Sequence, residues 1–109
     1  MLEVFLAVAD GEPVGFSAYT RNFSTFAGRP VLFLEDIFVE EEHRGKGYGK
    51  ALVKHGARLA VERGYCRMDW YCLDWNEPSR RFYESLGARP LAEWLLHRLE
   101  GDALRAAAE

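Results

Sequence analysis

An excess of basic charge and long hydrophobic runs are both missing from this sequence. The 109 residues carry 14 Lys and Arg against 17 Asp and Glu, a formal net charge of −3, so the overall charge disfavours a nucleic-acid-binding protein. No apolar run approaches the roughly 20 residues that span a bilayer, and the N-terminus lacks the pattern of a secretory signal. We therefore expect a cytoplasmic protein with neither nucleic acid nor membrane as a partner.

The chain also has few residues that could hold a metal. Cys66 and Cys72 do not form a Cys-x-x-Cys pair, and no histidine cluster accompanies them, so we expect no metal site. Two reduced, packed thiols are typical of a cytosolic protein. His43, His55 and His97 are scattered, and surface roles are expected for them.

What is present predicts one small α/β domain over residues 1–109, with 49% hydrophobic residues to fill a core. The expected strands are Glu3–Val8, Val14–Thr20, Val31–Val39, Met68–Leu73 and Ala92–Leu99. The expected helices are Tyr48–Arg63, a short one within Trp75–Gly87, and a helical or frayed tail at Gly101–Ala108.

These elements predict a mixed sheet. Asp10-Gly11 is a hairpin signal, so the first three strands form an antiparallel meander, with a loop at Asn22–Pro30. A strand–helix–strand crossover then joins the third and fourth strands, which makes that pair parallel and the crossover right-handed.

Two acids interrupt the third strand, Val31–Val39, which is otherwise apolar on both faces like a buried central strand. Glu35 and Asp36 break this pattern, and such breaks tend to fall at functional sites. In a regular strand the two carboxylates point to opposite faces, whereas a bulge brings both to one side. The alternative to a functional role is a salt bridge with Arg44 or Arg67.

Residues 44–49 read Arg-Gly-Lys-Gly-Tyr-Gly and lead into the first predicted helix. Glycines allow positive φ and close approach of a ligand, and the helix N-terminus offers unpaired N–H groups. The expected ligand is a phosphate or pyrophosphate, although neither the G-x-x-x-x-G-K-[ST] nor the G-x-G-x-x-G pattern is present. The alternatives are a solvated basic turn or a nucleic-acid contact, and the net charge argues against the second.

A second pattern follows about 30 residues later: Asn76-x-x-Ser79-x-x-Phe82-Tyr83-x-x-x-Gly87. Together with Arg44-x-x-Gly47-x-Gly49, it resembles the two halves of the acetyl-coenzyme A site of the GNAT N-acetyltransferases. Residues 34–39 and 75–79 resemble the diamine (spermidine/spermine) branch, which includes enzymes that act on thialysine. The resemblance covers essentially the whole chain, from Val4 to Trp94.

The resemblance implies acetyl-coenzyme A as cosubstrate, with its pantetheine arm between the splayed third and fourth strands. There it would pair with the main chain as an added strand does. The implied cofactor-binding residues are Ile37, Phe38, Val39, Arg44, Gly45, Lys46, Gly47, Tyr48, Gly49, Lys50, Asn76 and Ser79.

The resemblance also implies catalytic roles. Tyr83 would be the general acid that protonates the departing thiolate, and a structural tyrosine on a helix face is the alternative. Glu35 would accept a proton from the substrate ammonium, since an amine attacks only when neutral. Asp36 and Trp94 would join Glu35 in binding the substrate.

The implied activity is acetyl transfer to a primary amine of a small diamine- or lysine-like acceptor, by a homodimer. The family's usual N-terminal strand and two helices have no counterpart here, and residues 89–94 are short for a diamine substrate loop. A fragment, a late start site or a partner subunit would each account for that gap. The alternative function is a catalytically incomplete acetyl-coenzyme A-binding fragment or assembly module.

Overall fold

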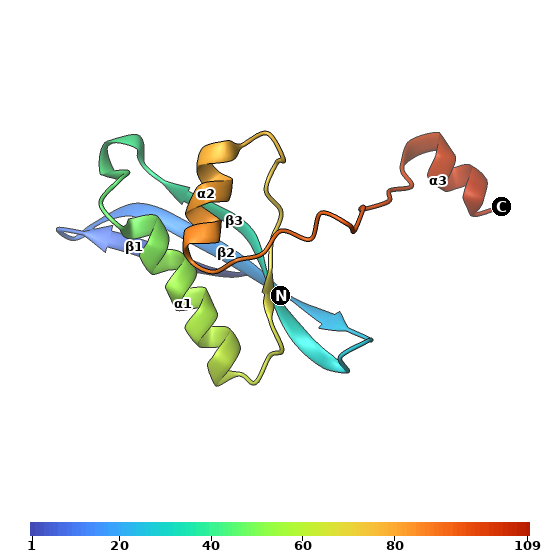
Figure 1. Cartoon of the computed structure of the whole chain (residues 1–109), viewed down its shortest axis with the longest axis horizontal. Coiled ribbons are helices and arrows are strands. Elements are labelled where there is room, and N and C mark those ends of the chain that lie inside the picture. The colour runs from blue at the N-terminus through green and yellow to red at the C-terminus, as the bar shows by residue number, and fades with distance from the viewer. The chain divides into compact units, whose positions relative to one another are not determined.

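The computed structural model describes all 109 residues, in two compact units, Met1–Tyr71 and Cys72–Glu109. The elements, in chain order, are β1 (Glu3–Ala9), β2 (Glu12–Ser24), β3 (Arg29–Val39), the 3-10 helix η1 (Glu41–His43), α1 (Tyr48–Glu62), β4 (Met68–Asp69), α2 (Glu77–Ser85) and α3 (Gly101–Ala107) (Figure 1). The predicted α/β class is confirmed.

The first unit is built on a four-stranded sheet in the order β1-β2-β3-β4. β1 and β3 both pair antiparallel with β2, as the meander predicted. β4 pairs parallel with β3 through Leu32 opposite Met68 and Phe33 opposite Asp69. The crossover through α1 therefore joins neighbouring parallel strands.

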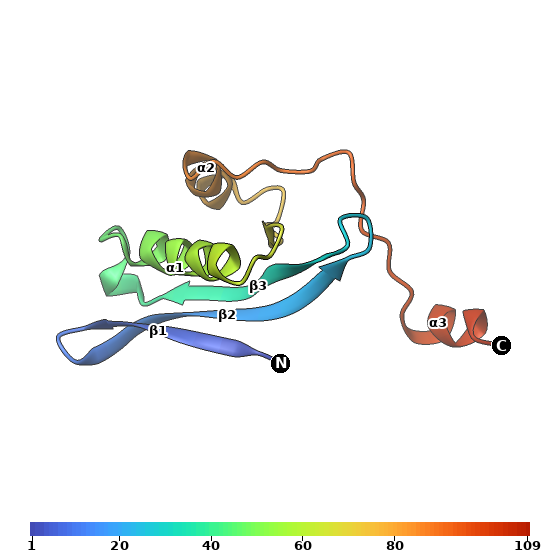
Figure 2. The same cartoon turned by 90° about the horizontal axis from the view of Figure 1, so that it is seen from below.

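The core of this unit lies between the sheet and α1, which covers one face of the sheet (Figure 2). Buried Tyr19, Leu32 and Leu34 pack with Ala60 of α1. The Tyr19 hydroxyl also donates to the carbonyl of Leu52, at 3.0 Å. This combination of apolar contact and one satisfied polar group fixes the helix on the sheet.

On the opposite face, no helix of this unit covers the sheet (Figure 2). Val4, Leu6 and Val8 of β1 leave 54%, 62% and 56% of their surface exposed there. Alternation along β1 accounts for this, because Glu3, Phe5 and the other odd-numbered residues face α1.

The hairpin between β2 and β3 is longer than predicted. The expected loop at Asn22–Pro30 shrinks to residues 25–28, because β2 continues to Ser24 and β3 begins at Arg29. The turn is closed by a hydrogen bond from the amide of Gly28 to the carbonyl of Ser24, at 2.7 Å. Antiparallel pairing thus extends to the turn itself.

Two predicted strands need correction. The strand expected at Met68–Leu73 is confined to Met68–Asp69, and the strand expected at Ala92–Leu99 is absent. Both segments have β-forming side chains, but a strand exists only where a neighbour takes its main-chain hydrogen bonds. The sheet has no strand after Asp69.

In the second unit, α2 begins at a side-chain cap. The Asn76 side-chain oxygen accepts a hydrogen bond from the amide of Ser79, at 3.4 Å, and Pro78 occupies the first turn. Gly87, with φ +95°, follows its last turn. α3 confirms the helical tail. None of the helices has the length and apolar character that crossing a membrane requires.

Candidate functional site

A β-bulge lies where the two acids interrupt β3. Ala18 pairs with Asp36 and the next residue, Tyr19, pairs with Leu34, so Glu35 is the extra residue. Leu34 and Ile37 therefore both pack in the core beneath α1. In a regular strand, two residues that are three positions apart would point to opposite faces of the sheet. The two carboxylates between them are both exposed.

The carboxylate of Glu35 accepts a hydrogen bond from the hydroxyl of Thr20 on β2, at 2.5 Å. The salt bridges considered as an alternative role are not formed. Arg44 donates instead to the carbonyl of Val39, at 2.9 Å, and Arg67 pairs with Asp69, also at 2.9 Å. Glu35 is thus held by a neutral donor.

Beyond the bulge, β3 has one free main-chain edge. Ile37, Phe38 and Val39 pair with β2 on one side. On the other side, the pairing with β4 ends at Phe33, so the rest of β3 has no strand neighbour there, and only the Val39 carbonyl is taken, by Arg44. This is the splayed parallel pair that was predicted, and its open edge could accept an extended ligand.

The glycine turn connects this edge to α1. Gly45 and Gly47 have φ of +77° and +90°, a left-handed conformation that side chains disfavour. Gly47 is the N-cap of α1, and no side chain caps the helix. The amides of the first helical turn, at Tyr48, Gly49 and Lys50, therefore lack a side-chain acceptor and can bind an anion.

Charge at this helix end favours an anion as well. Arg44, Lys46 and Lys50 are exposed, and the first turn of α1 has no acidic residue. The Arg44 guanidinium lies 5.7 Å from the centre of the Phe38 ring, which helps to hold it beside the end of β3.

Acidic residues precede the turn, in and next to η1. Ligand atoms of Glu40, Glu42 and His43 lie within 4.8 Å of one another, and Nδ1 of His43 is 3.7 Å from Glu40. Such a cluster on a surface turn is not by itself a metal site, and we assign no ion to it.

The second unit carries the other predicted site residues. Tyr83 and Ser79 are half-buried on α2, while Asn76 serves as its cap. Burial raises the pKa of the Tyr83 phenol, and the nearby Cys72 raises it further. Trp94 is 75% exposed, in the irregular stretch where a strand was expected.

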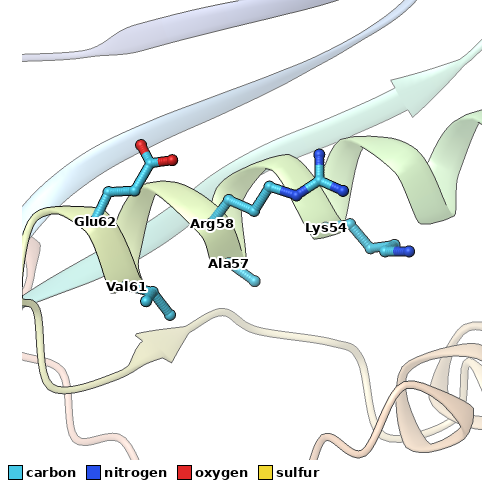
Figure 3. Close-up of a pocket in the computed structure, with 5 residues that line it drawn as sticks. All are labelled: Lys54, Ala57, Arg58, Val61 and Glu62. Atoms are coloured by element: carbon cyan, nitrogen blue, oxygen red, sulfur yellow. The ribbon is translucent and has the colours of Figure 1, made fainter.

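In the first unit, a shallow hollow of about 370 Å³ lies along the exposed side of α1. Its lining consists of Lys54, Ala57, Arg58, Val61 and Glu62, which project from a single helix (Figure 3). It includes none of the predicted site residues and has no second wall. The candidate site remains at the end of β3.

The first unit thus contains Glu35, Asp36, the edge of β3 that lacks a strand neighbour and the uncapped N-terminus of α1. Sequence reasoning missed Thr20, which holds Glu35. No signal in the sequence marks it, because the contact depends on the register between two strands.

Comparison with known proteins identifies a family and several relatives. Residues 2–88 match the family described as "Acetyltransferase (GNAT) family". L-ornithine N5-acetyltransferase NATA1 of Arabidopsis thaliana is 42% identical over 92 residues, which are 84% of this chain and 40% of the relative. Thialysine N-epsilon-acetyltransferase of Bos taurus is 39% identical over 105 residues, 89% of this chain and 61% of the relative.

Solved structures also include proteins that are similar to this chain. An integron cassette protein from V. cholerae superposes with a TM-score of 0.87 at 33% identity, covering 99% of this chain and 67% of that one. An aminoglycoside N-acetyltransferase solved in complex with CoA gives a TM-score of 0.78 at 28% identity, covering 92% and 77%. The chain spans 40% and 61% of the lengths of the two curated relatives. It belongs to the GNAT acetyltransferase family.

Proposed function

We propose that this chain carries the donor site and the acceptor carboxylates of an N-acetyltransferase. The reaction transfers an acetyl group from acetyl-coenzyme A to a primary amine of a small diamine- or lysine-like acceptor. The observation that carries the proposal is the order of three features along the chain from β3 to α1. Exposed Glu35 and Asp36 are followed by a free main-chain edge and then by the uncapped N-terminus of α1.

The residues present fit acetyl-coenzyme A in two respects. The amides of Gly45–Lys50, with the charges of Arg44 and Lys46, suit a pyrophosphate. The edge formed by Ile37–Val39 suits the amide-containing pantetheine arm, because main-chain pairing needs no particular side chain. Asn76 and Ser79 would supply further contacts from the second unit, although Asn76 already caps α2.

Glu35 is proposed as the base. A lysine-like amine has a pKa of about 10.4 and is an ammonium at neutral pH, so it must lose a proton before its nitrogen can attack. The Glu35 carboxylate attracts the cation and takes that proton, directly or through a water molecule. The nitrogen then forms a bond to the thioester carbonyl carbon as the carbon–sulfur bond breaks.

Tyr83 is proposed as the acid. Its phenol would give a proton to the departing sulfur and regain one from solvent. The attacking nitrogen would release its second proton to solvent, as would Glu35 the first, so that the products are an amide and a free thiol. Its raised pKa supports this role, because the phenol remains protonated and able to donate across the neutral range.

The acceptor class follows from the two carboxylates at the bulge. Glu35 and Asp36 are both exposed. Thr20 binds only the Glu35 carboxylate, so the Asp36 carboxylate is a second negative charge at the site. A second cationic group on the acceptor would pair with it, and Trp94 is proposed to bind the acceptor from the second unit. The names of two relatives, which specify ornithine and thialysine, support this class.

A turnover assay tests the proposal. We expect thiol release from acetyl-coenzyme A with diamines, ornithine or thialysine, and a fall of about a hundredfold in kcat for Tyr83→Phe with coenzyme A affinity unchanged. Tyr71→Phe, which alters an exposed tyrosine of the first unit, is the matched control. Calorimetric binding of coenzyme A without transfer to any amine would favour the alternative, a catalytically incomplete binding module.

We also propose that residues 1–109 act as one domain within a cytoplasmic homodimer. The two cysteines are free, which suits a reducing compartment. Exposed Val4, Leu6 and Val8 on one sheet face favour association with a second copy. Sedimentation equilibrium of the wild type and of Leu6→Lys tests this, and a wild type that remains monomeric at high concentration would refute it.

A further inference from the structure

Thr20 and Glu35 form a pair on the two central strands of the first unit. The Thr20 hydroxyl donates to Oε2 of Glu35 at 2.5 Å, across 15 residues of chain. No other hydrogen bond or ion pair reaches Glu35, so its second oxygen is free. A carboxylate held by one oxygen keeps the other available for a ligand.

Strand alternation determines which face of the sheet carries this pair. Tyr19 faces the core beneath α1, so its neighbour Thr20 faces the opposite side. Glu35 meets Thr20 there, because Glu35 follows the core residue Leu34 in the strand, and Thr20 pairs with Phe33, two residues before Glu35. The pair is therefore a diagonal contact across the two strands, within reach of a long side chain.

Threonine is well suited to hold a carboxylate from a strand. Its branched Cβ restricts χ1, so the hydroxyl has a fixed direction relative to the main chain. A glutamate side chain has three rotatable bonds, and the half-buried Thr20 removes much of that freedom by binding one end. The hydrogen bond is also to a charged acceptor, the stronger kind.

We propose that Thr20 is a positioning residue that aims the free oxygen of Glu35 at the acceptor ammonium. This rests on the proposed function, in which Glu35 takes the proton from that group. Thr20 touches neither the donor nor the acceptor and acts only through Glu35. Its contribution is orientation, so its loss slows the reaction step and leaves donor binding intact.

Kinetics of three variants test this role. Thr20→Val keeps the shape but removes the donor, and we expect kcat to fall about tenfold with the KM for acetyl-coenzyme A unchanged. Thr20→Ser keeps the hydroxyl and should retain most of the activity. Thr25→Val makes the same change in the exposed turn between β2 and β3, and it should leave kcat and KM unchanged.

A measurement that does not depend on activity accompanies the kinetics. In the wild type, the NMR side-chain couplings of Glu35 should report one dominant rotamer, and in Thr20→Val they should average. Thr20→Ala serves as a second variant if the valine protein is poorly folded. If the wild type transfers no acetyl group, the proposed function fails, yet the couplings still decide whether Thr20 holds Glu35.

Two results would overturn the inference. One is a set of Glu35 couplings that is the same in wild type, Thr20→Val and Thr20→Ala. The other is a Thr20→Ser variant that loses as much kcat as Thr20→Val, because then the hydroxyl is not the part of Thr20 that matters.

Discussion

The ring of Tyr19 lies directly against the main chain of Gly56, where α1 crosses the sheet. A Cβ on Gly56 would lie 2.6 Å from Cζ of Tyr19, far inside normal contact distance. The Tyr19 hydroxyl is meanwhile tied to the carbonyl of Leu52, so the ring cannot move aside freely. The glycine therefore sets how closely α1 approaches β2.

Gly56→Ala should destabilise the protein by about 1–3 kcal/mol, because the added methyl overpacks the core. Helix propensity alone predicts the opposite sign, since alanine is favoured over glycine by about 1 kcal/mol. Ala57→Gly, one residue further on the exposed side, measures the propensity effect by itself. Urea unfolding of both variants checks this, and a more stable Gly56→Ala would contradict the packing argument.

Burial of Tyr19 should make the protein less stable in alkali. Burial raises the pKa of this phenol above its ordinary value of 10.0. Between the unfolded and the folded pKa, the folded state holds more protons than the unfolded state, so the free energy of unfolding falls as the pH rises above about 10. Unfolding curves from pH 8 to 11, with tyrosinate absorbance recorded in parallel, measure this fall in the free energy of unfolding.

Tyr19→Phe serves as the comparison for that alkaline loss. It removes the buried ionisable group together with its bond to Leu52, so it should lower stability near pH 8 and flatten the fall above pH 10. The pKa of Tyr83 is also raised, so Tyr83 contributes part of the alkaline loss of stability, and that part remains in Tyr19→Phe. An equally steep fall in Tyr19→Phe would show that the buried phenol is not its source.

The edge strand β1 is tied to the end of α1 by a two-pronged ion pair. The Arg63 guanidinium donates to both oxygens of Glu3, at 2.6 and 2.8 Å, and this bond lowers the pKa of the Glu3 carboxyl below 4.5. Both side chains are 35% exposed, so Glu3→Gln should cost less than about 1 kcal/mol.

That cost has a defined pH dependence. The Glu3 pKa is lower in the folded state than in the unfolded state, so the ion pair stabilises the fold at pH values above the unfolded-state pKa. This stabilisation is lost as the pH falls through the folded-state pKa. Glu3→Gln and wild type should thus differ at pH 7 and converge in acid, with a smaller difference in high salt. Glu62→Gln, beside Arg63 but without an ion pair, is the control, and equal losses in both variants would argue against the pair.

Gly47→Ala should weaken coenzyme A binding at least about tenfold. The left-handed φ of +90° strains any side chain by roughly 1–2 kcal/mol and distorts the amides at the start of α1. Gly64→Ala is a matched control, since Gly64 has φ +71° at the other end of α1 and equally open surroundings. Calorimetry should show weaker binding in the first variant alone, and weakening in both would indicate a general loss of stability.

The sequence predicted the parts of this protein that depend on local pattern. The apolar run at Val31–Val39, the glycines after it and the cap at Asn76 each specify a backbone through neighbouring residues. The bulge at Glu35 was one of two possibilities, and the packing of Leu34 and Ile37 on one side accounts for it. Local pattern does not reveal which of two registers buries more apolar surface.

The parts that could not be predicted depend on distant partners. Residues 92–99 have strand-like side chains, but they form no strand. The contact between Thr20 and Glu35 likewise arises from the pairing of two strands. Cross-strand neighbours follow from register, and a shift by one residue would replace every one of them.

Only two residue pairs join β4 to β3, reinforced by main-chain bonds from Leu32 to Arg67 and from Cys66 to Pro30. So short a ladder can open at little cost while β1, β2 and the remainder of β3 stay paired. Amide protons along this seam should therefore exchange with solvent through local fraying, long before the molecule unfolds as a whole. Under the proposed function, this short ladder would let the two strands separate for the pantetheine arm while the β1–β2–β3 meander stays paired.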